Sequence, residues 1–157
     1  ISLKKLKNKK LFNENITKYS SEIAKSKKIR LLVKKFQKDF SKKNHVCIEG
    51  RDIGSVICPN ADIKLFFKCS LKVRARRRWN EYKKNKSKIT LNEVKKALKI
   101  RDYLDINRKY SPLRSTKDSI VIDTSKLSKK QTLSKISGII EKKLLLKYGR
   151  NFKTRKK

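Results

Sequence analysis

Residues 45–69 read HVCIEGRDIGSVICPNADIKLFFKC, and this stretch decides the fold class. It contains three short runs rich in Val, Ile and Phe, at His45–Glu49, Ser55–Cys58 and Ile63–Cys69. Glycines and the pair Pro59-Asn60 separate the runs. Short apolar runs bounded by turn residues are typical of buried strands. We therefore predict three strands in this part of the chain.

Helical patterns lie on both sides of these strands. Apolar residues recur at helical spacing over 13–26 and 28–41 on the amino-terminal side. On the carboxyl-terminal side we predict a basic helix over about 70–83 and a helix from the capping box Thr90-x-x-Glu93 to about Arg108. A fourth strand at 119–123 precedes a last helix, which Ser128-x-x-Gln131 caps.

Strands that alternate with helices predict an α/β fold, in which helices flank a largely parallel sheet. Such sheets bind ligands at the carboxyl ends of their strands. The loop Gly50-Arg51-Asp52 directly follows the strand predicted to end at Glu49, so we expect it to lie at a binding site.

The charge of the chain suggests an anionic partner. Its 157 residues carry a formal net charge of +34, which is expected of a protein that binds nucleic acid or an anionic surface. However, of the 47 basic residues only eleven are Arg, and the Lys residues are spread along every segment. Arg grips phosphate with a planar fork, whereas Lys is a hydrated point charge, so the positions of Arg are more informative.

The remaining composition argues against several classes of protein. Cys47, Cys58 and Cys69 have no paired ligand spacing, so we expect small apolar side chains in a reducing cytoplasm and no metal site. No apolar stretch approaches the length of a membrane span, and no signal peptide is visible, so we expect a cytoplasmic protein. The sequence contains no Met, so we expect a fragment of a longer protein.

The helix predicted from Thr90 changes character along one face. Val94, Leu98, Arg101, Asp105 and Arg108 share a narrow sector, which begins apolar and ends charged. Charged groups in line with core residues point inward and need partners. An anionic ligand with hydroxyl groups would supply them, and so would a structural ladder of ion pairs.

A second group of arginines lies on the basic helix. Arg74, Arg77 and Arg78 share a helix face and could surround a phosphate group. A basic, solvated helix face is the alternative.

These segments together resemble a known family. The string IEGRDIGSVICPNADIKLFF, followed by VRARRRW, IRDYLDINRKYSPL and SIVIDTSKLS, is similar to the cytidylate kinase family in order and spacing. The resemblance covers about residues 11–140. It implies a P-loop NTPase-like parallel sheet with a helical lid and part of a nucleotide-binding insert.

The resemblance implies roles for particular residues. Those implied to bind the substrate are Ser21, Arg30, Gly50, Arg51, Asp52, Arg101, Asp105 and Arg108. Ser21, Arg30 and Asp52 would hold the cytosine ring. Arg51 and Arg108 would grip the phosphate, and Arg101 and Asp105 the sugar. The implied catalytic residues are Arg74, Arg77, Arg78 and Arg108, and those of the basic helix would neutralise charge on the transferred phosphoryl group.

The resemblance also implies the reaction and the organisation of the chain. The family moves the γ-phosphoryl group of ATP to CMP or dCMP with Mg²⁺, giving CDP or dCDP. We expect part of the nucleotide-binding insert at 1–43, the core at 44–147 with the lid at about 70–110, and a basic disordered tail at 148–157. CMP, dCMP and ATP would be the partners of a monomer, with no specific nucleic acid and no membrane.

One part of the family's pattern is absent. The sequence has no GxxxxGK[ST] string, the P-loop that cradles the phosphates of ATP, so we predict that the P-loop strand is missing. We therefore expect these residues by themselves not to turn over substrate. The alternative function is a basic nucleic-acid-binding protein.

Overall fold

A computed structural model describes residues 19, 23, 26–43, 46–85 and 87–149. Its helices are α3 (Lys27–Ser41), α4 (Leu71–Lys84), α5 (Leu91–Asn107) and α6 (Lys129–Tyr148). Its strands are β1 (Leu65–Lys68) and β2 (Ile120–Asp123), and Ile53–Ile57 forms a short π-helix, η2. Most of the helix predicted over 13–26, and the tail from residue 150, lie outside the described residues.

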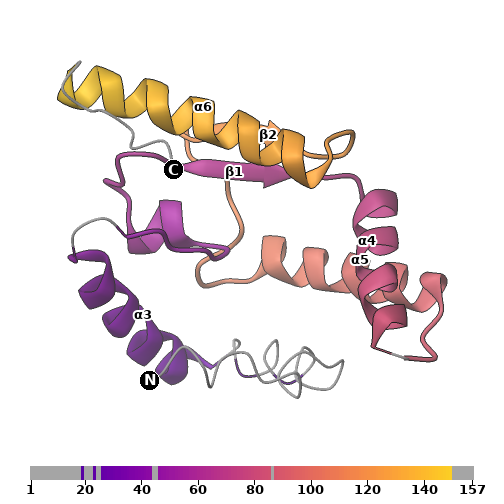
Figure 1. Cartoon of the computed structure of the whole chain (residues 1–157). Helices are drawn as coiled ribbons and strands as arrows, with labels where there is room; N and C mark the ends of the chain where they lie inside the picture. Colours follow the sequence, from indigo (N-terminus) through magenta and orange to yellow (C-terminus); the bar gives the residue numbers. More distant parts are fainter. Residues whose placement is uncertain (1–18, 20–22, 24–25, 44–45, 86, 150–157) are drawn as a thin grey trace.

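The two strands form a parallel pair. Leu65 lies opposite Ile120 and Lys68 lies opposite Asp123. Parallel neighbours need a long crossover connection, and α4 and α5 supply it, packed against each other at one end of the molecule (Figure 1). This arrangement confirms the predicted α/β fold with a parallel sheet.

Two of the predicted strands are not strands in the structure. Residues 46–49 have no regular structure, and the run at 55–58 falls largely within η2. The amide groups of Val56 and Ile57 donate to the Asp52 carbonyl (2.9 and 3.3 Å), and that of Cys58 donates to the Ile53 carbonyl (2.7 Å). Local hydrogen bonds thus satisfy this backbone without a neighbouring strand. A short apolar run does not by itself distinguish a strand from a helical turn.

The ends of the helices follow the predicted local chemistry. Ser70, Thr90 and Ser128 each accept a hydrogen bond from a first-turn amide of α4, α5 and α6, respectively. Complete capping boxes form at Thr90–Glu93 and Ser128–Gln131, as predicted. These contacts fix where α5 begins.

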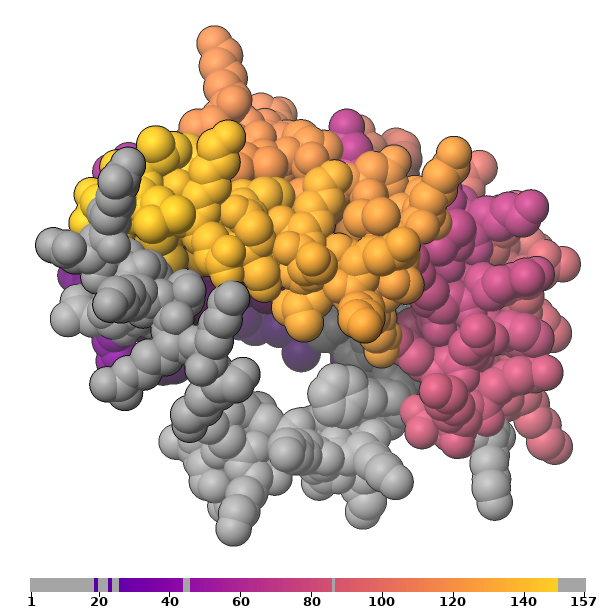
Figure 2. Space-filling view, turned by 45° about the horizontal axis from the view of Figure 1, so that its top comes forward, coloured from indigo at the N-terminus to yellow at the C-terminus, as the bar shows by residue number. Residues whose placement is uncertain are grey.

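The core of the described residues is small. Its buried apolar side chains are Ile57, Ala75, Val94 and Ile122. Helix α6 runs along the sheet in Figure 1 and lies across the face of the molecule shown in Figure 2, with α4 and α5 at one end. Within the described part of the chain, no helix has the length and apolar character needed to cross a membrane.

Candidate functional site

The charged face of α5 points inward, as its spacing predicted. The side chains of this face are all buried or half-buried, and they are Val94, Leu98, Arg101, Asp105 and Arg108. The intervening Lys95 and Lys99 are exposed. Helical periodicity places these side chains on one face, and the buried Val94 turns that face towards the core.

Asp105 is the centre of a cluster of arginines. Its Oδ2 atom lies 3.1 Å from Arg51 Nε and 3.9 Å from Arg101 Nε, and its Oδ1 atom accepts a hydrogen bond from Arg108 Nη1 (3.2 Å). The Asp105 side chain is only 15% exposed. The structure therefore brings together four residues that the sequence placed in two separate motifs.

One oxygen of this carboxylate is incompletely satisfied. Asp105 Oδ2 is buried and accepts no hydrogen bond from the described residues. The short distance to Arg51 Nε gives electrostatic attraction, but the N–H direction does not give a hydrogen bond. A buried acceptor of this kind has capacity for a donor such as a hydroxyl group.

A second ion pair lies beside the first cluster. Arg30, in the first turn of α3, places Nη1 3.8 Å from Asp52 Oδ2, and both side chains are largely buried. Across the two groups, four guanidinium ions face two carboxylates, which leaves an excess of two positive charges.

The excess positive charge affects the pKa of Arg108. Burial, together with the nearby positive charge of Arg30, lowers the pKa of Arg108 from its ordinary value. Arg51 contributes in the same direction, whereas Asp105 and Asp52 oppose the change. The site therefore holds like charges close together, an arrangement that an anion would stabilise.

Gly50 has a steric role in the same loop. A Cβ atom at Gly50 would lie 2.7 Å from Ile53 Cγ1, which is closer than real contacts allow. The absence of a side chain lets Ile53 of η2 fold back over the loop that carries Arg51 and Asp52. Ser21, which the resemblance assigns to the cytosine ring, lies outside the described residues.

The arginines of α4 do not converge on one point. Arg74 forms a two-pronged ion pair with Asp102 of α5, with Nη1–Oδ1 at 2.9 Å and Nη2–Oδ2 at 2.6 Å. Arg77 donates to the carbonyls of Thr124 and Leu127 (2.8 and 2.9 Å).

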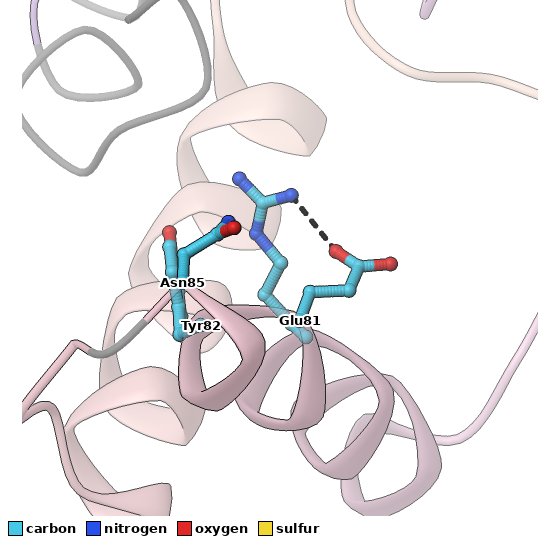
Figure 3. A pocket seen from close by; sticks show the side chains of 4 residues that line it. Glu81, Tyr82 and Asn85 are labelled. Carbon is cyan, nitrogen blue, oxygen red and sulfur yellow. Dashed lines mark hydrogen bonds and ion pairs between the residues drawn. The ribbon is translucent and has the colours of Figure 1, made fainter. Parts of the chain in front are cut away.

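The third arginine of this helix lines a pocket. Arg78 pairs with Glu81 (3.1 Å) and lies over the Tyr82 ring, and with Asn85 these residues surround a half-open pocket of about 410 Å³ (Figure 3). The pocket shares no residue with the Asp105 cluster. The role of the three α4 arginines in phosphoryl transfer stays a prediction.

Sequence reasoning missed the partners of two arginines. Asp102 lies in the segment IRDYLDINRKYSPL, but no role was predicted for it. It is 28 residues from Arg74, and no local sequence pattern predicts a contact over that separation. Arg77 binds backbone carbonyl groups, which every residue has, so no residue type in the sequence predicts these contacts. Among the described residues, no group of His, Cys, Asp or Glu side chains could hold a metal ion.

An α/β fold with a parallel sheet and a positively charged arginine cluster is typical of proteins that bind nucleotides or phosphate. Comparison with known families gives the particular one. The model of the cytidylate kinase family matches residues 3–142, and the chain belongs to that family.

Curated relatives carry the same family name. The chain is 40% identical over 132 residues to a cytidylate kinase of Clostridium botulinum (strain Loch Maree / Type A3), covering 84% of this chain and 59% of the relative. It is 41% identical over 133 residues to that of Fusobacterium nucleatum, covering 85% and 59%. For Clostridium tetani the identity is 36% over 138 residues, covering 88% and 59%. The chain thus spans about three-fifths of the length of these relatives.

Proposed function

We propose that this chain is the acceptor-binding part of an enzyme that transfers the γ-phosphoryl group of ATP to CMP or dCMP. The observation that carries the proposal is the cluster in which Arg51, Arg101 and Arg108 surround Asp105. Family membership supports the reaction class, and the names of the curated relatives support cytidylate as the substrate.

The charge of the cluster suits a nucleoside monophosphate. A phosphate monoester carries about −1.5 to −2 charges at pH 7, which matches the excess of two positive charges among the paired groups. In this proposal Arg51 and Arg108 bind the phosphate, because guanidinium groups bind its oxygens in pairs. The ion pairs with Asp105 would hold both arginines in place for the phosphate.

The sugar and the base are assigned to the flanking groups. The unsatisfied Asp105 Oδ2 would accept a hydrogen bond from a sugar hydroxyl, with Arg101 beside it. The Arg30–Asp52 pair would present a donor edge and an acceptor edge to the cytosine ring, together with Ser21. Paired donors and acceptors of this kind discriminate between bases better than apolar contacts do.

The contribution of these residues to the reaction is positional and electrostatic. Phosphoryl transfer asks for aligned groups and neutralised charge, with little covalent chemistry from the protein. The arginines would hold the attacking phosphate of CMP and reduce its repulsion with ATP. The segment at about 70–110 would act as the lid that excludes water, which otherwise accepts the phosphoryl group.

ATP and Mg²⁺ belong to the proposed reaction, but the described residues do not fit the metal. They contain no cluster of metal-binding side chains, and the sequence has no P-loop string. No step proposed for this chain runs through Mg²⁺. We further propose that the protein acts as a monomer and that its partners are CMP, dCMP and ATP, with no specific nucleic acid and no membrane.

Calorimetric titration of the 157-residue chain with CMP tests the proposal. We expect binding that Arg108→Ala and Asp105→Ala each weaken by about ten- to a hundredfold, since a hydrogen bond to a charged group contributes about 1.5–3 kcal/mol. Arg114→Ala is the matched control, because this exposed arginine lies outside the cluster. Titration with single-stranded RNA at two salt concentrations completes the experiment. Tight, salt-sensitive RNA binding without CMP binding would reject the proposal in favour of nucleic-acid binding.

A further inference from the structure

The connection that follows α5 contains an unusual backbone conformation. Ser111 has φ 53°, and among the described residues it alone combines a positive φ with a side chain. Residues other than glycine rarely adopt this left-handed region, and the next residue is Pro112, which restricts Ser111 further. Such a conformation persists only where surrounding contacts hold it in place.

The contacts of this connection lead directly to the arginine cluster. The Ser111 carbonyl accepts a hydrogen bond from Arg108 Nε at 2.5 Å. The amide group of Leu113 donates to the Asp105 carbonyl at 2.7 Å, which folds the connection back against the end of α5. The left-handed turn at Ser111 therefore places one carbonyl group against a side chain of the cluster.

Arg108 is consequently held from two directions. Its Nε atom binds Ser111, and its Nη1 atom binds Asp105 Oδ1 at 3.2 Å. This side chain lies near the positive charges of Arg30 and Arg51, which would otherwise repel it. The Ser111 carbonyl is a neutral acceptor, so it restrains the orientation of the Arg108 guanidinium group without cancelling the charge of that group.

We propose that Ser111 is a positioning residue: its left-handed backbone aims a carbonyl group at Arg108 Nε and orients the guanidinium group for the phosphate of the acceptor nucleotide. The consequence for nucleotide binding rests on the proposed function. The orientation itself rests on the contacts of Arg108 with Ser111 and Asp105.

Two substitutions of Ser111 separate the effect of the backbone conformation from the effect of the serine side chain. Glycine adopts a positive φ without penalty, so Ser111→Gly keeps the turn. Valine is branched at Cβ and strongly disfavours this region, so Ser111→Val displaces the carbonyl. Ser115→Val is the matched control, since Ser115 is an exposed serine in the same connection. Ser111→Ala replaces the valine variant if circular dichroism shows that the latter does not fold.

The first measurement uses no ligand. Nuclear magnetic resonance of the ¹⁵Nε–Hε groups, with the Arg108 signal assigned through Arg108→Lys, reports on the hydrogen bond to Ser111. We expect hydrogen exchange at Arg108 Nε to be about tenfold faster in Ser111→Val, and unchanged in Ser111→Gly and Ser115→Val. Equal protection of Arg108 Nε in Ser111→Val would overturn the proposal.

The second measurement is titration with CMP. We expect Ser111→Val to weaken binding about tenfold in the wild-type background and to have no further effect in an Arg108→Ala background. An equal loss in both backgrounds would overturn the link between Ser111 and Arg108. If the wild-type chain does not bind CMP, the proposed function fails, and the Arg108 Nε signal still decides whether Ser111 orients Arg108.

Discussion

The ion pair between Arg74 and Asp102 connects the first turn of α4 to the second half of α5, and its contribution to the free energy of unfolding can be measured. We predict that a double-mutant cycle with Arg74→Ala and Asp102→Ala gives a coupling free energy of about 1–2 kcal/mol. The pair has ideal two-pronged geometry, with oxygen–nitrogen distances of 2.9 and 2.6 Å. Arg74 Nε is also fixed, by the carbonyl of Cys69 at 3.0 Å.

The magnitude follows from the exposure of the two side chains. Exposed ion pairs contribute about 0.2–1 kcal/mol, whereas loss of one partner of a buried pair costs about 3–5 kcal/mol. Arg74 and Asp102 are 33% and 27% exposed, so water screens the pair only in part. An intermediate value is therefore expected. Each kcal/mol lost shifts the melting temperature of a protein of this size by about 2–4 °C.

Urea unfolding followed by the fluorescence of Trp79 measures this free energy. Trp79 is the only tryptophan in the chain, and it lies on α4 with its indole N–H bonded to the Ile89 carbonyl at 3.1 Å. The signal therefore reports on the packing of the helix whose anchor is removed. The slope of unfolding free energy against urea should stay constant across the four proteins, as two-state unfolding requires.

The pair Arg78–Glu81 on the same helix is the matched control. Arg78 is as exposed as Arg74, but Glu81 is 60% exposed and the two residues lie three apart on one helix, so their coupling should not exceed about 0.5 kcal/mol. A coupling below this value for Arg74–Asp102 would refute the reasoning, because the fork would then be no more stabilising than a surface pair. It would also leave Arg74 available for the phosphoryl contact that the resemblance implies.

Three further predictions concern stability. The hydrogen bond from Lys64 holds the pKa of Asp118 at about 2, below its usual 3.8, so this contribution is complete above about pH 4 and is lost as the pH falls towards 2. Asp118→Asn should therefore be less stable than wild type at pH 5 but not at pH 2, and a constant difference in urea midpoints would contradict this. Thr90→Ala removes the N-cap of α5 and should cost about 1 kcal/mol in urea unfolding, whereas an unchanged midpoint would show that the cap is dispensable. Gly50→Ala forces a methyl group against Ile53 and should lower the unfolding free energy by about 1–3 kcal/mol; a thermal midpoint equal to that of wild type would argue against the clash.

Local chemistry explains which elements the sequence predicted well. The starts of α5 and α6 were visible as capping boxes, because the serine or threonine and its partner lie within one turn. The inward face of α5 followed from helical spacing alone. Two of the four strands, at 65–68 and 120–123, were also placed correctly, within a residue or two at each end.

The sequence predicted the wrong secondary structure where it depends on segments that are distant along the chain. The apolar pattern at 55–58 predicts a strand, but in the structure its backbone amides donate locally to the carbonyls of Asp52 and Ile53. A strand exists only where an adjacent segment accepts and donates its hydrogen bonds, and short runs of sequence carry no information about that segment.

The residues of the arginine cluster were predicted by motif, but their arrangement was not. Sequence spacing determined that Arg101, Asp105 and Arg108 share a face and that Arg51 follows an apolar run. Only the tertiary structure brought Arg51 to Asp105, Asp102 to Arg74 and the carbonyl of Ser111 to Arg108. The physical reason is that helix periodicity is fixed by the local backbone, whereas a contact between distant charges depends on how the whole chain folds.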